Sequence, residues 1–223
     1  MNIRLFFSAV LKFSIGLLFI GLLIFLPAGT LDYPNAWIFM AALFIPMFIA
    51  GIVMMIKNPE LLKKKLNAKE KVGTQKAVIL FSSLMFISGF VLAGLDFRFK
   101  WTNVPKSAVI ISTVLFLLSY IMYAEVLREN AYLSRTIEVQ ENQKVIDTGL
   151  YANVRHPMYT ATLILFLTMP LILDSFISFI VFLIYPVLTI IRIKNEEELL
   201  TKELKGYDEY QKKVRYRLIP YIW

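Results

Sequence analysis

The amino-acid sequence predicts an all-α, polytopic integral membrane protein, and three observations indicate this fold class. Of its 223 residues, 58% are hydrophobic and 18% are charged. The mean hydropathy of +0.64 is too high for a soluble domain of this length. Several apolar runs also approach the roughly 20 residues that a helix needs to cross a bilayer. We therefore expect a single membrane domain, 1–223, with five to six transmembrane helices.

The N-terminal part, 1–127, is expected to form four transmembrane helices. The first apolar run contains Lys12, exceeds the length of a signal-peptide core and lacks a small-residue cleavage site after it, so we expect a retained helix. Tyr33, Trp37 and Trp101 fall at the expected membrane interfaces, which aromatic rings favour. The four runs are Leu5–Leu26, Ala36–Ile56, Ala77–Leu95 and Ser107–Leu127.

The distribution of lysine predicts the orientation of these helices. The segment 57–76 is rich in lysine, whereas the loop 27–35 contains neither lysine nor arginine. Because basic loops stay on the cytoplasmic side, we expect the segment 57–76 and the N-terminus there. The loop 96–106 is then external, although it also carries basic residues. The lysines of the cytoplasmic segment are Lys57, Lys63, Lys64, Lys65, Lys69, Lys71 and Lys76.

The C-terminal part, 128–223, is expected to combine a helical hairpin with a cytoplasmic cap. A polar stretch, Arg128–His156, precedes two apolar helices, Pro157–Leu173 and Ser175–Ile193, which are too close in sequence for anything but an antiparallel hairpin. The first of them is short for a full crossing. The tail, Arg192–Trp223, has apolar residues at helical spacing and predicts an amphipathic helix on the membrane surface, broken at Gly206. The C-terminus is therefore expected to be cytoplasmic.

The composition also excludes several kinds of site. There is no cysteine, so disulfides, thiolate zinc sites and a cysteine nucleophile are excluded. A single histidine leaves no histidine-rich metal site, and we expect no bound metal. The formal charge of +8, carried next to apolar runs, predicts contact with the anionic headgroups of a lipid bilayer. We expect no nucleic-acid binding, because no basic helix or aromatic platform stands apart from the membrane segments.

Two polar clusters, 140–159 and 192–198, flank the hairpin and must meet at its cytoplasmic end. Pro157 predicts the first turn of a helix, so Arg155 and His156 lie where free N–H groups and the helix dipole favour an anionic ligand. Arg192 and Glu196 are four residues apart, on one face of a helix, where the apolar run ends. Such a pair indicates a functional site, unless Arg192 only extends to the lipid headgroups and the glutamates begin a solvated face.

Three motifs follow one another in the C-terminal part. They read G-x-Y-x-x-V-R-H-P-x-Y at Gly149–Tyr159, R-x-x-x-E-E-x-x-L at Arg192–Leu200, and G-Y-x-x-Y followed by V-x-Y-R-L-I-P at Gly206–Pro220. In residue type, order and spacing they resemble the isoprenylcysteine carboxyl methyltransferase family and the related membrane phospholipid methyltransferases. The stretches NPELL at Asn58–Leu62 and GLDFRFKW at Gly94–Trp101 resemble the bacterial branch of that family.

This resemblance implies a multi-pass methyltransferase that uses S-adenosyl-L-methionine. The cofactor would lie between the polar loop, the hairpin and the tail. Arg192 and Glu196 are implied as the catalytic residues, with Arg192 facing a lipophilic or membrane-associated methyl acceptor and Glu196 on the cofactor. The implied cofactor-binding residues are Gln140, Gln143, Lys144, Val145, Ile146, Tyr151, His156, Pro157, Met158, Tyr159 and Glu196.

The implied chemistry fits these residue types. Methyl transfer from a sulfonium to a carboxylate or thiolate needs alignment and exclusion of water more than acid–base help. Arg192 could hold an acceptor carboxylate in a bidentate contact, and the helix start at Pro157 could receive the carboxylate of the cofactor. An amine acceptor would need a base, and Glu196 and His156 are the candidates.

Several functions stay open. The acceptor could be an isoprenylcysteine-like carboxylate, but relatives with this tail also resemble phospholipid amine and small-thiol methyltransferases. Sterol reductases resemble the family in the hairpin and the tyrosine-rich tail, so an NADPH-dependent membrane reductase is a second class, and a non-catalytic scaffold is a third. The short chain and the R-x-x-x-E-E pattern favour the methyltransferase. The resemblance to the bacterial branch implies a bacterial inner membrane.

Overall fold

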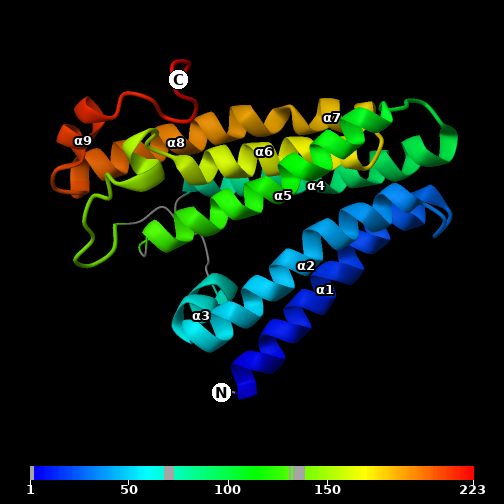
Figure 1. Cartoon of the computed structure of the whole chain (residues 1–223), viewed down its shortest axis with the longest axis horizontal. Helices are drawn as coiled ribbons and strands as arrows, with labels where there is room; N and C mark the ends of the chain where they lie inside the picture. Colours follow the sequence, from blue (N-terminus) through cyan, green and yellow to red (C-terminus); the bar gives the residue numbers. More distant parts are fainter. Residues whose placement is uncertain (1–2, 68–72, 131, 133–138) are drawn as a thin grey trace.

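The structure, a computed structural model, describes residues 3–67, 73–130, 132 and 139–223. These residues form helices and loops without a β-strand among them, which confirms the all-α class. The helices (Figure 1) are α1 (Ile3–Ala28), α2 (Pro34–Lys57), α3 (Pro59–Asn67), α4 (Gly73–Phe99), α5 (Lys106–Glu129), the 3₁₀ helix η1 (Gly149–Ala152), α6 (Pro157–Ile172), α7 (Phe176–Phe182), α8 (Ile184–Glu203) and α9 (Tyr207–Lys213). Lys69, Lys71 and part of the predicted polar loop lie outside the described residues.

Among the residues that the structure describes, five helical segments are long and apolar enough to cross a bilayer, as the sequence predicted. The protein is thus an integral multi-pass membrane protein. The sixth segment, α6, is apolar but has only 16 residues, or about 24 Å at 1.5 Å per residue, against a hydrocarbon core of about 30 Å. The five segments are Ile3–Ala28, Pro34–Lys57, Lys76–Phe99, Lys106–Glu129 and, for α7 and α8 together, Phe176–Glu203.

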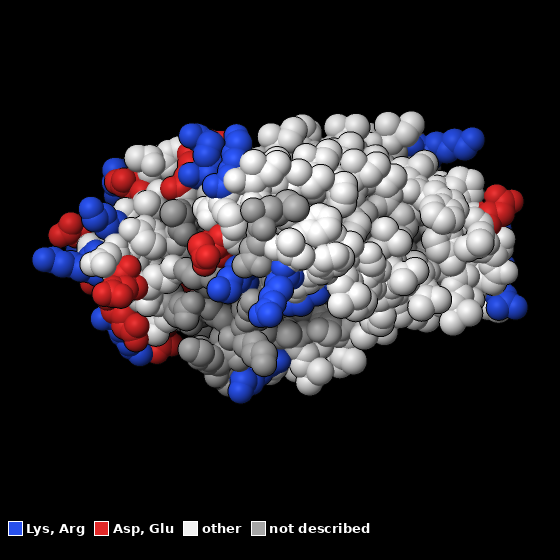
Figure 2. Space-filling view, turned by 90° about the horizontal axis from the view of Figure 1, so that it is seen from below, with Lys and Arg blue, Asp and Glu red and all other residues white. Residues whose placement is uncertain are grey.

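The connections between the helices lie at two ends of the molecule (Figure 1). The end of α5, α9 and the described part of the loop before α6 lie on the left of the figure, and α3 and the start of α1 lie below them, toward the middle. The links from α1 to α2, from α4 to α5 and from α6 to α7 lie at the opposite end. Figure 2 shows charged side chains gathered toward the two ends, with a wide uncharged band between them. The start of α1 and the C-terminus therefore both lie away from the end that holds the link from α1 to α2.

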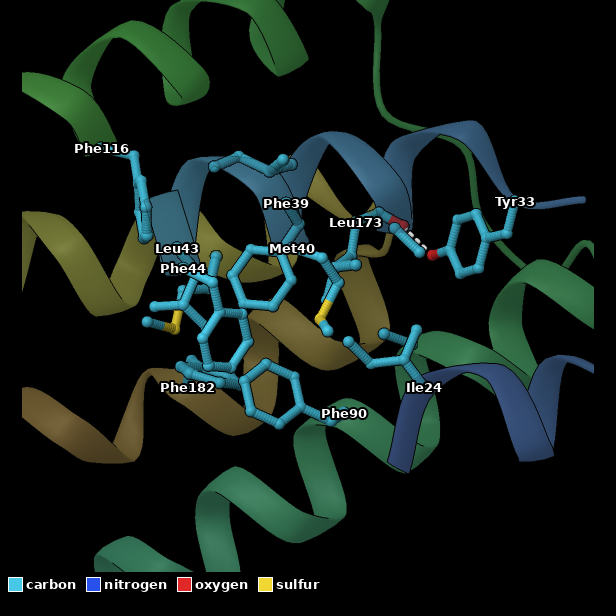
Figure 3. Close-up of a cluster of buried hydrophobic side chains, with 14 of the residues drawn as sticks. Ile24, Tyr33, Phe39, Met40, Leu43, Phe44, Phe90, Phe116, Leu173 and Phe182 are labelled. Atoms are coloured by element: carbon cyan, nitrogen blue, oxygen red, sulfur yellow. Dashed lines mark hydrogen bonds between the residues drawn. The ribbon is translucent and has the colours of Figure 1, made fainter. Parts of the chain in front are cut away.

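A cluster of aromatic side chains joins α2, α4, α5 and α7 (Figure 3). The ring of Phe39 lies 5.6 Å from that of Phe90 and 6.1 Å from that of Phe116, measured between centroids. Gly89 permits the close approach of α7 to α4, because a Cβ there would lie 2.3 Å from the Phe182 ring. Helices in a bilayer associate through packing of this kind, since lipid is as apolar as the side chains. The cluster thus fixes the hairpin against the other helices.

The hairpin helix that carries Arg192 and Glu196 differs from its predicted extent. The segment Ser175–Ile193 was expected to end at Ile193, but α8 continues to Glu203. The two polar side chains therefore lie on the hairpin itself, and the predicted amphipathic tail helix is reduced to α9. The predicted break at Gly206 is confirmed, with φ at +87°.

The same segment is interrupted at Leu183, between α7 and α8. Pro186 explains this break, because its ring clashes with the carbonyl of the residue four positions earlier, Phe182, and it donates no hydrogen bond. The interruption is local, and α7 and α8 together still form one apolar segment long enough to cross a bilayer.

Tyr33 is placed differently from the interfacial position that was expected. Its side chain is 1% exposed, stacks on Phe97 with 3.8 Å between ring centroids, and donates a hydrogen bond to the carbonyl of Leu173. Trp37 and Trp101, in contrast, are about half exposed, at 52% and 51%. Tyr33 thus binds the turn of the hairpin to the loop between α1 and α2.

Candidate active site

A pocket opens at the end of the molecule that holds the polar loop. Its walls come from the end of α5, the loop before η1, the start of α6, the last turns of α8, and α9. The space between these walls is about 830 Å³, counting the part open to solvent. The lining residues are Asn130, Tyr132, Gln143, Lys144, Val145, Ile146, Tyr151, Arg155, His156, Met158, Tyr159, Arg192, Glu196, Leu199, Leu200, Leu204, Tyr207 and Tyr210.

Gly149 allows the loop to turn into the pocket wall. Its φ of +53° favours glycine, and an added Cβ would lie 1.4 Å from Oε1 of Glu129, so a larger residue would displace that carboxylate. Glu129 Oε2 accepts a hydrogen bond from the Leu150 amide at 3.0 Å. The side-chain amide of Asn130 donates to the Tyr151 hydroxyl at 3.0 Å. The end of α5 thereby holds η1 and the tyrosine that follows the glycine.

The start of α6 follows the geometry that Pro157 predicted. His156 occupies the N-cap position with φ −126° and ψ 60°, outside the helical region, as expected for a residue before proline. The backbone amides of Arg155 and His156 donate to the carbonyls of Tyr216 and Arg217, both at 2.9 Å. The tail therefore lies against the helix start, and both side chains are buried.

Glu197 is the centre of a buried ionic network. Its Oε1 accepts from Arg155 Nε at 2.7 Å and lies 3.1 Å from His156 Nε2, while its Oε2 accepts from Arg217 Nε at 2.7 Å. The Arg155 guanidinium also donates to the carbonyls of Val214 and Arg215. Three segments distant in sequence thus meet at one carboxylate that is 5% exposed.

Arg192, Tyr159 and Glu196 form a second, separate chain of contacts on the pocket side. Arg192 Nε donates to the Tyr159 hydroxyl at 2.8 Å, and that hydroxyl donates to Glu196 Oε2 at 2.6 Å. His156 Nδ1 lies 4.0 Å from Glu196 Oε1. One tyrosine on α6 therefore fixes the positions of the cation and the carboxylate on α8.

Most of the sequence-predicted site residues come together in this pocket. The carboxylate, the guanidinium and the aromatic side chains lie on its walls with the loop residues. Gln140 and Pro157 do not line it: Pro157 is fully buried, and the Gln140 side chain donates to the Tyr132 carbonyl. The residues brought together are Gln143, Lys144, Val145, Ile146, Tyr151, His156, Met158, Tyr159, Arg192 and Glu196.

Gln143 forms two hydrogen bonds with Gln140 of the same loop. The Gln143 side-chain Oε1 accepts from the Gln140 backbone amide at 2.9 Å, and the Gln143 backbone amide donates to the Gln140 backbone carbonyl at 3.0 Å. Asn142, with φ +58°, closes this turn. The two glutamines thus shape the loop that forms one wall.

Sequence reasoning did not assign a role to Glu197 or to Tyr207. The consecutive glutamates were a signal, because neighbouring residues on a helix point about 100° apart and so serve two different faces. Glu196 faces the pocket, whereas Glu197 faces Arg155 and the tail. Tyr207 appeared in the G-Y-x-x-Y motif, but its place in the pocket depends on how α9 folds back.

Burial affects the acidity of the tyrosines that lie outside the membrane-spanning helices. It raises the pKa of the Tyr151, Tyr207 and Tyr210 phenols above the ordinary value. Nearby carboxylates raise it further, Glu196 for Tyr151 and both Glu196 and Glu197 for Tyr207. These hydroxyls therefore stay protonated at neutral pH.

Comparison with known proteins shows that part of the chain is similar to a known family. Residues 106–206 match the family model described as phospholipid methyltransferase. The match runs from the start of α5 to the residue before α9, and includes His156, Arg192 and Glu196. This segment of the membrane protein is therefore similar to the phospholipid methyltransferase family.

A sterol reductase is also similar to part of the chain. A stretch of 91 residues is 31% identical to the Delta(14)-sterol reductase TM7SF2 of Mus musculus. It covers 40% of this chain and 22% of the reductase, so the chain spans about a fifth of that protein's length.

Proposed function

We propose that this protein is a membrane methyltransferase that uses S-adenosyl-L-methionine and transfers its methyl group to a lipophilic acceptor. The observation that carries the proposal is the contact chain from Arg192 through Tyr159 to Glu196 on the wall of the pocket. All three residues lie in the segment that matches the phospholipid methyltransferase family. A cation and an anion held at fixed positions can align two reactants, which is the main requirement of this reaction.

The residues of the pocket fit this cofactor in their chemistry. Glu196 presents a carboxylate that can accept hydrogen bonds from ribose hydroxyls or from an ammonium group. Val145, Leu200 and Leu204 form an apolar wall that suits a flat purine ring. When bound, the cofactor would supply an electrophilic methyl group on a sulfonium. The loop residues 143–146 and the turn around His156 also line the pocket, and they could hold the amino-acid portion of the cofactor.

Arg192 would bind the methyl acceptor. Its Nε is held by the Tyr159 hydroxyl, which fixes the plane of the guanidinium. A guanidinium in a fixed plane can bind a carboxylate with two parallel hydrogen bonds. This supports an isoprenylcysteine-like carboxylate as the acceptor, in a protein that would be isoprenylcysteine O-methyltransferase-like.

A phospholipid amine or a small thiol is the alternative acceptor. An amine would need a base. The candidates are Glu196, which also accepts from Tyr159, and His156, whose Nε2 lies 3.1 Å from Glu197. A carboxylate or thiolate needs no such base, and we favour it for that reason.

The direction of approach follows from where the pocket lies. The lysine-rich segment 57–76 supports a cytoplasmic position for the pocket end, and hence for both termini, by the positive-inside rule. A polar cofactor would then bind from the cytoplasm, and a lipophilic acceptor would arrive laterally between helices. We place the protein in a bacterial inner membrane on the resemblance of its motifs to the bacterial branch.

An NADPH-dependent reductase is the second candidate function, favoured by the partial similarity to the sterol reductase. Calorimetric binding to the detergent-purified protein separates the two. The proposal expects micromolar binding of S-adenosylhomocysteine and no binding of NADPH. Binding of NADPH alone would transfer the assignment to a reductase, and binding of neither would favour a non-catalytic scaffold.

A further inference from the structure

Tyr207, the first residue of α9, places a buried phenol on the wall of the pocket. The side chain is 4% exposed. Its hydroxyl has no hydrogen-bond partner among the described residues. Buried hydroxyls nearly always have a partner, because an unpaired one has lost its bonds to water without replacement. The hydroxyl therefore lacks a hydrogen-bond acceptor among the described residues, and a bound molecule could supply one.

The neighbouring tyrosine on the same helix provides a contrast. The Tyr210 hydroxyl donates to the carbonyl of Tyr151 at 2.8 Å, so it is satisfied within the protein. Both rings pack in one apolar cluster with Leu204 and Val214, and their centroids are 5.8 Å apart. Packing thus fixes both side chains equally, but only one of the two hydroxyls is used.

The charges near Tyr207 determine what its hydroxyl can do. Glu197 and Glu196 raise the pKa of this phenol, in addition to burial, while Arg155 lowers it. The phenol is therefore neutral and carries its proton at physiological pH. It can donate a hydrogen bond, and Tyr207 lines the same pocket as Glu196.

We propose that Tyr207 is a further cofactor-binding residue, whose hydroxyl donates a hydrogen bond to an acceptor atom of the bound nucleoside cofactor. This inference rests on the proposed methyltransferase function. It assigns a role to α9, which lies beyond the matched family segment 106–206: the helix closes the pocket and supplies one ligand contact.

The test compares Tyr207→Phe with Tyr210→Phe, which each remove one hydroxyl from the same helix. For Tyr207→Phe, we expect S-adenosylhomocysteine to bind about 5- to 10-fold more weakly in calorimetry, the loss of one hydrogen bond. Without ligand, the melting temperature of this variant should be unchanged or higher, because an unpaired buried hydroxyl has been removed. Tyr210→Phe should lower the ligand-free melting temperature, because its hydroxyl is bonded to Tyr151.

Two results would overturn the inference while leaving the proposed function intact. One is wild-type affinity for S-adenosylhomocysteine in Tyr207→Phe. The other is a loss of ligand-free melting temperature in Tyr207→Phe as large as in Tyr210→Phe, which would mean that the hydroxyl has a partner within the protein. If the wild-type protein itself failed to bind S-adenosylhomocysteine, the proposed function would fail, and this inference with it.

Discussion

Arg155 and Glu197 lie 42 residues apart in sequence and form a buried ion pair, with 2.7 Å between Nε and Oε1. The pair joins the start of α6 to the last turns of α8. His156 and Arg217 share the same carboxylate. Because Arg155 and His156 also line the pocket, this network joins the pocket wall to Glu197 on α8 and to the tail.

Replacing Glu197 by Gln should destabilise the protein strongly. The change leaves two buried or half-buried guanidinium groups without their anion, and breaking a buried pair costs about 3–5 kcal/mol. Glu198→Gln is the matched control, because Glu198 is exposed and its ion pair with Lys202 lies on the surface, where such a pair contributes little to stability. Thermal unfolding in detergent measures both. Equal melting temperatures for the two variants would contradict a structural role for this network.

Arg192→Ala and Glu196→Ala should have different effects on the proposed reaction. Loss of Arg192 should abolish methyl transfer but largely keep S-adenosylhomocysteine binding, whereas loss of Glu196 should weaken that binding, by about tenfold or more for a charged hydrogen bond. Radiolabelled methyl transfer to a prenylated cysteine analogue, with calorimetry in parallel, checks this. Wild-type turnover in both variants would show that the site is assigned wrongly.

Gly149→Ala should damage the pocket through two effects. The residue has φ +53°, and its Cβ would collide with the Glu129 carboxylate. Gly206→Ala is the control, because φ is +87° there but nothing lies within 4 Å of the added Cβ. We expect Gly206→Ala to cost about 1 kcal/mol of strain and Gly149→Ala clearly more, with weaker S-adenosylhomocysteine binding. Similar effects of the two on stability and binding would argue against the close contact with Glu129.

Stability should fall at alkaline pH because of the buried tyrosines of α9. Burial raises the pKa of Tyr207 and Tyr210 in the folded protein, whereas the unfolded chain titrates near about 10. The unfolded state then loses these protons first, so the stabilisation is full below about pH 10 and is lost as the pH rises further toward the folded pKa values. Melting temperatures at about pH 8 and pH 11 should show a smaller drop for a Tyr207→Phe/Tyr210→Phe double variant than for wild type. An equal drop would mean that other groups dominate.

The sequence predicted the helices well where one physical requirement decides the outcome. A bilayer-spanning segment must be long, apolar and helical. The apolar runs of α1, α2, α4, α5 and the hairpin were recognisable for that reason. Pro157 and Gly206 marked a helix start and a helix break through backbone chemistry alone, and both are found there. Tyr33 was misplaced because a tyrosine near a membrane boundary can face lipid or the protein interior, and only the packing of α1 against α4 selects the interior.

The sequence by itself therefore determined the all-α class and the apolar segments long enough to cross a bilayer, and it marked the polar residues that stand where apolar runs end. The tertiary structure decided which of them act together. Glu196 and Glu197 are adjacent and chemically identical, yet one contacts Tyr159 in the pocket and the other binds Arg155, His156 and Arg217 behind it. That division depends on the rotation of α8 relative to α6 and the tail, which is set by long-range packing that no local pattern encodes.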